Sequence, residues 1–186
     1  MTIDTELPAQ SRSWTFHPSE LDDGRLSIDH LAGSVSLLMH SVKTLAATDA
    51  FRPRFTVENW RILGSYLMRR TLKGNDVLIR QGESDRTTYL LESGTLLVHA
   101  RRETGSSPIS LLRAGAIVGE PALFGETVRM AQVDALAPCV VWSLTRSRLE
   151  ELRAGHPELA YEILRAAGAS MAERMRSTLA HGTPLL

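Results

Sequence analysis

The chain has 186 residues, which is enough for one domain with a sizeable hydrophobic core and flanking helices but short for two full domains. Its 21 basic and 21 acidic residues cancel, so no overall electrostatic field favours nucleic acid or an anionic membrane surface. Its one cysteine, Cys139, excludes an intramolecular disulfide bond and an iron–sulfur cluster, which needs several thiolate ligands.

Residues 1–26 mix proline, serine and acidic side chains without a sustained period, which predicts a poorly ordered N-terminal arm. A helical extension is expected over residues 27–54, because apolar residues there recur at alternating spacings of three and four. These residues are Ile28, Leu31, Val35, Leu38, Val42 and Leu45. Two interpretations of the stripe stay open: it packs on its own domain, or it forms a coiled coil or a site for a partner.

A β-rich domain is expected over residues 55–144. Thr56 caps a short helix that runs through about Tyr66, and beyond it the apolar period falls to two while turn signals become frequent. The strand-like runs are 67–72, 77–80, 88–91, 95–101, 109–112, 131–135 and 139–144. Many short strands at this spacing predict a barrel or a jelly roll.

Two helices are expected over residues 145–180. Thr145 caps a short one, and a longer one begins at Pro157 and runs to about Leu179. The apolar residues of the long helix form two stripes, one with Leu159 and Ile163, the other with Tyr161, Leu164, Met171 and Met175. Between them lies a patch of small residues, 166–170, which would let a second helix come close. The long helix therefore forms a dimer seam or packs only on its own domain, and both alternatives remain open.

The most specific motif is Gly119-Glu120-Pro121-Ala122-Leu123-Phe124, which is followed by Arg129-Met130-Ala131. Pro121 suits the first position of a helical turn, and such a turn directs free amides at an anion. The guanidinium of Arg129 suits a phosphate, whereas Glu120 can only accept hydrogen bonds and so suits sugar hydroxyls. Because a ribose and a phosphate lie side by side in a cyclic nucleotide, this pair predicts such a ligand.

The motif resembles the phosphate-binding cassette of the cyclic nucleotide-binding domain family, which includes catabolite activator protein, the regulatory subunits of protein kinase A and cyclic-nucleotide-gated channels. The resemblance extends from about Phe55 to about Pro157 and includes the runs 79–85 and 89–94. It implies a mostly β fold with flanking helices: a jelly-roll-like β-roll with N-terminal helices and a long C-terminal helix. In several bacterial relatives that helix forms the dimer seam and covers the nucleotide base.

The resemblance also implies the roles of single residues. Glu120 would take the ribose 2′-hydroxyl and Arg129 would pair with the cyclic phosphate. Backbone N–H groups of Ala122 and Met130 would complete the phosphate cradle. The expected ligand-binding residues are Gly119, Glu120, Ala122, Arg129, Met130 and Ala131.

Two positions depart from the family pattern. Pro121 stands where the family has an aliphatic residue, and Met130 stands where it has serine, threonine or alanine. Because Met130 offers only a weak thioether acceptor in place of a hydroxyl that can bond guanine, we expect cyclic AMP to bind better than cyclic GMP. The alternative is a ligand-free interaction module in which Arg129 pairs with Glu120 or Glu126.

Enzymatic activity, a metal site and a resident cofactor are not expected. The six histidines lack ligand spacing such as His-Glu-x-x-His, so surface or capping roles are expected for them. Opening a cyclic phosphodiester needs a metal cluster or a nucleophile with its base, and neither motif lies beside the cassette. We therefore expect a receptor.

The output of this receptor is expected to pass through an unidentified effector protein. Family members that bind DNA continue into a helix-turn-helix, and residues 180–186 are too few for one, so direct DNA binding is not expected. The start lacks a basic stretch followed by an apolar one, and no apolar run approaches the length of a membrane span. A cytoplasmic homodimer without membrane insertion is therefore expected.

Overall fold

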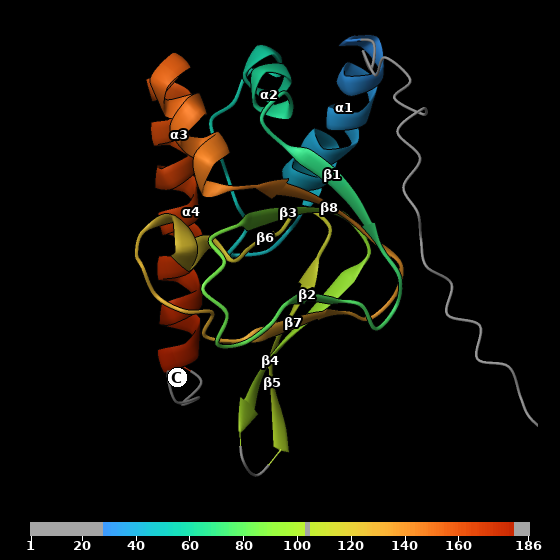
Figure 1. Cartoon of the computed structure of the whole chain (residues 1–186), viewed down its shortest axis with the longest axis vertical. Helices are drawn as coiled ribbons and strands as arrows, with labels where there is room; N and C mark the ends of the chain where they lie inside the picture. Colours follow the sequence, from blue (N-terminus) through green and yellow to red (C-terminus); the bar gives the residue numbers. More distant parts are fainter. Residues whose placement is uncertain (1–27, 103–104, 181–186) are drawn as a thin grey trace, which may run out of the picture.

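The computed structural model describes residues 28–102 and 105–180. The arm expected over 1–26 lies outside the described residues. Helices flank a β-rich centre, with two helices before it and two after it (Figure 1). The helices are α1 (Ile28–Thr44), α2 (Val57–Gly64), α3 (Arg146–Gly155) and α4 (Pro157–Ala180). None of the described helices is long and apolar enough to cross a membrane.

Two four-stranded antiparallel sheets face each other and form a β-roll, so the expected fold class is confirmed. The strands are β1 (Met68–Leu72), β2 (Val77–Ile79), β3 (Thr88–Ser93), β4 (Thr95–Arg102), β5 (Gly105–Arg113), β6 (Ile117–Val118), β7 (Gln132–Ala135) and β8 (Cys139–Leu144). One sheet has the order β1-β8-β3-β6 and the other β2-β7-β4-β5. Between the sheets lies a core cluster that includes the fully buried Leu91, Leu96 and Val141.

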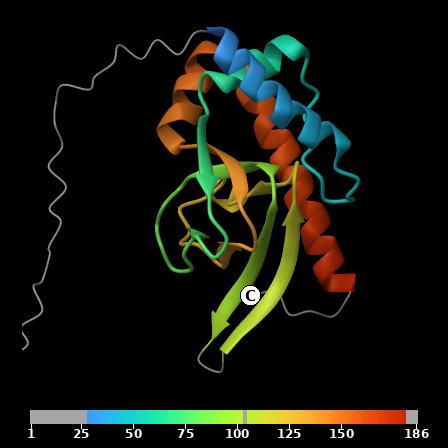
Figure 2. The same ribbon diagram turned by 90° about the vertical axis from the view of Figure 1, so that its right-hand side faces the viewer.

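Two strands differ from the expectation. Strand β6 was not expected, because its two residues are too few to show a period. Strand β5 begins at Gly105 instead of Ile109, because its polar first half pairs with β4 while facing solvent. The β4–β5 hairpin extends to the opposite end of the molecule from α1 and α2 (Figure 2).

The apolar stripe of α1 packs on its own domain wherever its side chains are described. Val35, Leu38 and Val42 are buried in a second core cluster, together with Trp60 of α2 and Trp142 of β8. This favours the first interpretation of the stripe over a coiled coil. The side chains of the first helical turns lie outside the description.

The small-residue patch of α4 turns its buried residues toward its own domain, which favours the second of the two alternatives for this patch. Ala166, Ala167 and Ser170 are buried, and Ala167 has no exposed surface. Ala166 and Ala167 belong to the same core cluster as the α1 stripe. The small side chains let α4 lie close against the rest of its own chain. The other face of α4 remains exposed and carries Tyr161, Met175 and Leu179.

Candidate functional site

A single turn of 3-10 helix, η1 (Glu120–Leu123), starts the site, as the sequence predicted for this motif. Gly119 precedes it with φ of +76°, a left-handed conformation that favours glycine. A Cβ at Gly119 would also lie 2.8 Å from Nη1 of Arg129 and 3.0 Å from the carbonyl oxygen of Thr87. Glycine is therefore required both by the backbone and by the close approach of the arginine. In this turn the amide of Ala122 donates to the Gly119 carbonyl oxygen (3.2 Å).

Arg129 is 6% exposed and is held by three residues from two segments. Its Nη2 donates to Oδ2 of Asp85 (2.5 Å) and to the carbonyl oxygen of Thr87 (2.5 Å), and its Nη1 donates to the carbonyl oxygen of Gly119 (3.3 Å). Its Nε is buried and has no partner among the described residues. A buried donor without an acceptor is costly, so this atom is the strongest local indication of an anionic ligand.

The pairing of Arg129 with Asp85 was not predicted, although Asp85 lies in the run that carries the resemblance. Burial tends to raise the pKa of Asp85, but hydrogen bonds from Arg129 and Thr87 outweigh it and lower the pKa below its ordinary value of 3.8. The ion pair expected for the ligand-free alternative, between Arg129 and Glu120 or Glu126, is wrong for this structure. Glu126 instead pairs with Arg86 (3.2 Å).

Glu120 is 4% exposed, and its carboxylate pairs with an arginine of α4 that the sequence did not single out. Nη1 of Arg174 donates to Oε1 of Glu120 (2.5 Å). The same guanidinium donates from Nε to Oδ2 of Asp49 (2.8 Å) and from Nη2 to the carbonyl oxygen of Ile117 (2.9 Å). No hydrogen bond to the second oxygen of Glu120 is found within residues 28–102 and 105–180.

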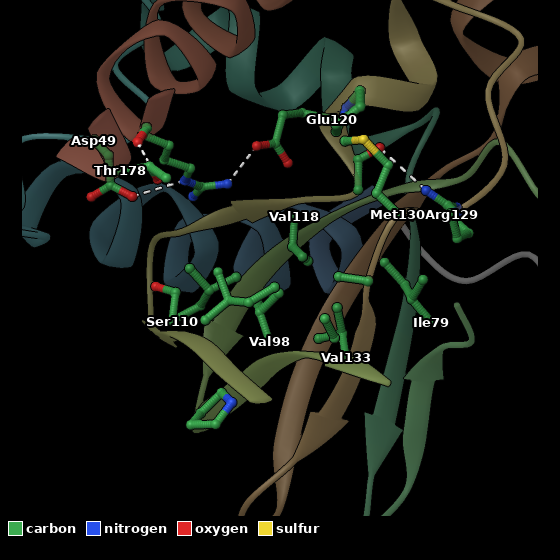
Figure 3. A pocket seen from close by; sticks show the side chains of 18 of the residues that line it. Asp49, Ile79, Val98, Ser110, Val118, Glu120, Arg129, Met130, Val133 and Thr178 are labelled. Carbon is green, nitrogen blue, oxygen red and sulfur yellow. Dashed lines mark hydrogen bonds and ion pairs between the residues drawn. The ribbon is translucent and has the colours of Figure 1, made fainter. Parts of the chain in front are cut away.

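These groups surround a cavity of about 530 Å³, and all six residues predicted to bind ligand line it. This volume is within the range of small-molecule sites, roughly 300–1,000 Å³. Figure 3 shows Arg129 at one end, Asp49 and Thr178 at the other, and Glu120 between them. The β-roll side of the cavity is mainly apolar, with Arg102, Ser107 and Ser110 also in its lining. Its apolar lining residues include Ile79, Val98, Leu112, Val118 and Val133.

The β4–β5 hairpin supplies a further wall that the sequence did not predict. Residues 107–110 line the cavity, and Ile109 lies at the register shift between β4 and β5 beside His99. His99 is buried, which differs from the expected surface role. Its Nδ1 lies 2.5 Å from Oγ of Ser106 and its Nε2 lies 2.6 Å from Oδ2 of Asp134, so it ties the hairpin to β7.

The arrangement suits a small molecule that carries an anionic group. One end offers a buried guanidinium, the middle offers a carboxylate acceptor, and the walls offer apolar surface for a flat group. Among the described residues no group of three or more histidine, cysteine, aspartate or glutamate side chains could hold a metal ion.

Comparisons with known proteins agree with this geometry. A family model described as the cyclic nucleotide-binding domain matches residues 69–156. The cGMP-dependent protein kinase egl-4 of Caenorhabditis elegans is 38% identical to this chain over 82 residues, which are 42% of this chain and 10% of the kinase. The match therefore spans about a tenth of that relative.

Solved structures of similar fold cover more of the chain. A cyclic nucleotide-binding domain from Methylobacillus flagellatus has a TM-score of 0.72 at 22% identity, covering 83% of this chain and 86% of the other. Catabolite activator protein of Thermus thermophilus has a TM-score of 0.61 at 23% identity, with 69% and 59% covered. The regulatory domain of Toxoplasma gondii protein kinase A with cAMP has a TM-score of 0.55 at 19% identity, with 64% and 44% covered. At these identities the similarity is one of fold.

Proposed function

The chain belongs to the cyclic nucleotide-binding domain family through residues 69–156. We therefore propose that it is a receptor that prefers cyclic AMP to cyclic GMP. We also propose that it signals through a partner protein. The domain itself is regulatory and not catalytic. The observation that carries the proposal is the buried Arg129, whose Nε has no partner among the described residues, at the end of a cavity that also holds Glu120.

Arg129 would bind the cyclic phosphate. Two of its nitrogens already donate to Asp85, Thr87 and Gly119, which fixes the plane of the guanidinium before ligand arrives. Such preorganisation lowers the cost of binding, because the side chain has little freedom left to lose. Met130, whose amide would complete the cradle, lies on the cavity rim with an exposed side chain, and Gly119, Ala122 and Ala131 would complete the site.

Glu120 would accept a hydrogen bond from the ribose 2′-hydroxyl through the carboxylate oxygen that Arg174 leaves unused. Arg174 offsets the charge of Glu120, which otherwise would repel the phosphate of the ligand in the same cavity. Glu120, paired with Arg174, is therefore compatible with a ligand that carries both hydroxyl groups and an anionic group.

Two side chains support the proposed preference for cyclic AMP. The hydroxyl of Thr178 donates to the carbonyl oxygen of Arg174 (2.9 Å), so only its acceptor capacity faces the cavity. The exocyclic N6 amine of adenine is a donor, whereas O6 of guanine is an acceptor. Met130 likewise offers guanine no hydroxyl. Because egl-4 is named as a cGMP-dependent kinase, the preference must be measured with both nucleotides.

Isothermal titration of the protein with cyclic AMP and with cyclic GMP tests the proposal directly. We expect heat from both, with a lower dissociation constant for cyclic AMP. Tighter binding of cyclic GMP would contradict the preference. Absence of heat with either nucleotide at millimolar concentration would contradict the receptor function.

The second candidate is a ligand-free interaction module, and one observation favours it. Glu120 and Arg129 are both already paired, with Arg174 and Asp85, so neither charge requires a ligand for balance. The unpartnered Nε of Arg129 argues the other way. The same titration separates the two candidates.

A homodimer would form through the exposed face of α4. Tyr161, Met175 and Leu179 lie on this face, and the exposed Phe124 packs beside it at Gly168. A second copy would cover these apolar groups. The cytoplasmic location expected from the sequence is part of the same proposal. The domain boundaries expected after residues 54 and 144 also stay a prediction.

A further inference from the structure

We propose that Asp49 is a positioning residue for the nucleotide site, which holds Arg174 against Glu120 and thereby couples the segment between α1 and α2 to ligand binding. This inference rests on the proposed function of the cavity. Asp49 lies in that segment, 125 positions before Arg174 in the sequence, and yet borders the same cavity.

Helix α4 contacts Asp49 at two points one helical turn apart. Oγ of Ser170 donates to the backbone carbonyl oxygen of Asp49 (2.6 Å), and Nε of Arg174 donates to its carboxylate (2.8 Å). Because residues four apart lie on the same helix face, both contacts fix the same side of α4. Ser170 is buried, so the backbone contact is shielded from water.

The guanidinium of Arg174 has a partner on each of its three nitrogens. Asp49 accepts a hydrogen bond from Nε, Glu120 accepts one from Nη1, and the carbonyl oxygen of Ile117 accepts one from Nη2. The group is planar and rigid, so an acceptor on one nitrogen determines where the others point. Asp49 therefore sets the direction from which Arg174 meets Glu120.

Loss of Asp49 would free one side of this guanidinium. The Arg174 side chain is one-quarter exposed, so it could turn toward solvent, whereas the Glu120 side chain is almost completely buried. A buried carboxylate without its partner is strongly disfavoured, and it would repel the ligand phosphate. Nucleotide affinity would fall although Asp49 itself need not touch the ligand.

The test is a double-mutant cycle in the full chain, with cyclic AMP as the probe and calorimetry as the assay. We expect Asp49→Ala to weaken binding by about fivefold, the size typical of a partly buried charge pair. Asp49→Asn should weaken it less, because the amide oxygen can still accept from Nε. In an Arg174→Ala background, Asp49→Ala should cause no further loss. Thermal unfolding of each variant checks that it folds.

Glu173→Gln is the matched control, because it removes an ion pair with Arg176 (2.7 Å) on the same helix but away from the cavity. Its affinity should be unchanged. An equal loss from Asp49→Ala with and without Arg174 would overturn the inference, since it would indicate a general structural role. Unchanged affinity of Asp49→Ala would overturn it too, while leaving the proposed function intact. If the unmodified protein binds no nucleotide, both fall together.

Discussion

Replacement of Arg129 by alanine is the most direct test of the site. The side chain is buried and its Nη atoms are occupied by Asp85, Thr87 and Gly119, so the phosphate would gain the Nε donor and the positive charge. One charge-assisted hydrogen bond contributes about 1.5–3 kcal/mol. We therefore expect cyclic AMP affinity to fall by roughly 10- to 150-fold, since every 1.4 kcal/mol is a factor of ten.

Stability should change less than affinity. The Asp85 side chain is about half exposed, so water can satisfy its carboxylate when Arg129 is removed. Arg129→Lys should recover part of the binding, because it keeps the charge but lacks the planar fork. Arg86→Ala is a suitable control, since Arg86 pairs with the exposed Glu126 near the same cassette without lining the cavity.

Calorimetry gives the dissociation constants, and thermal unfolding without ligand gives the change in stability. A variant that keeps its melting temperature and loses affinity would agree with the reasoning. If Arg129→Ala bound cyclic AMP as well as the unmodified protein does, the phosphate would have to lie elsewhere and the assignment of the site would be refuted.

Three further predictions follow from other parts of the molecule. Met130→Ser should raise cyclic GMP affinity more than cyclic AMP affinity, and equal changes in the two dissociation constants would contradict the role given to this position. Light scattering should give about twice the chain mass of 20.5 kDa, and Met175→Glu, which alters an exposed residue of α4, should give a monomer. The hydrogen bond from Arg165 outweighs burial and lowers the pKa of Glu162 from 4.5 to about 2. The ionised Glu162 should therefore stabilise the fold fully above pH 5, and this stabilisation should disappear as the pH falls toward 2. Glu162→Gln should lower the melting temperature at pH 7 and not at pH 2.

The sequence predicted the parts of the site that are close together along the chain. Gly119, Glu120 and Arg129 lie within one short segment whose turn and spacing are recognisable, and the β-roll follows from the period of two. The partners of these residues could not be predicted in the same way. Arg174 meets Glu120 from 54 positions away, and its position on α4 looks like that of any exposed arginine in a helix.

The small-residue patch of α4 illustrates a second limit. Small side chains indicate close approach of another element, but they do not say whether it belongs to the same chain or to a second one. In the structure, Ala166 and Ala167 pack against their own domain. The burial of His99 likewise could not be predicted from the sequence, because its two hydrogen-bond partners are on other strands.

The cavity is lined by residues from Thr48 to Thr178, nearly the whole span of the described chain. Its walls therefore cannot be completed during synthesis until α4 has left the ribosome. The same separation affects how the domain should be expressed. A fragment cut at the limits of the family match, residues 69–156, would keep the cassette but lack Asp49, Arg174 and Thr178. Binding measured on such a fragment would therefore describe a cavity that lacks part of its wall. Nucleotide binding should instead be measured on the whole 186-residue chain.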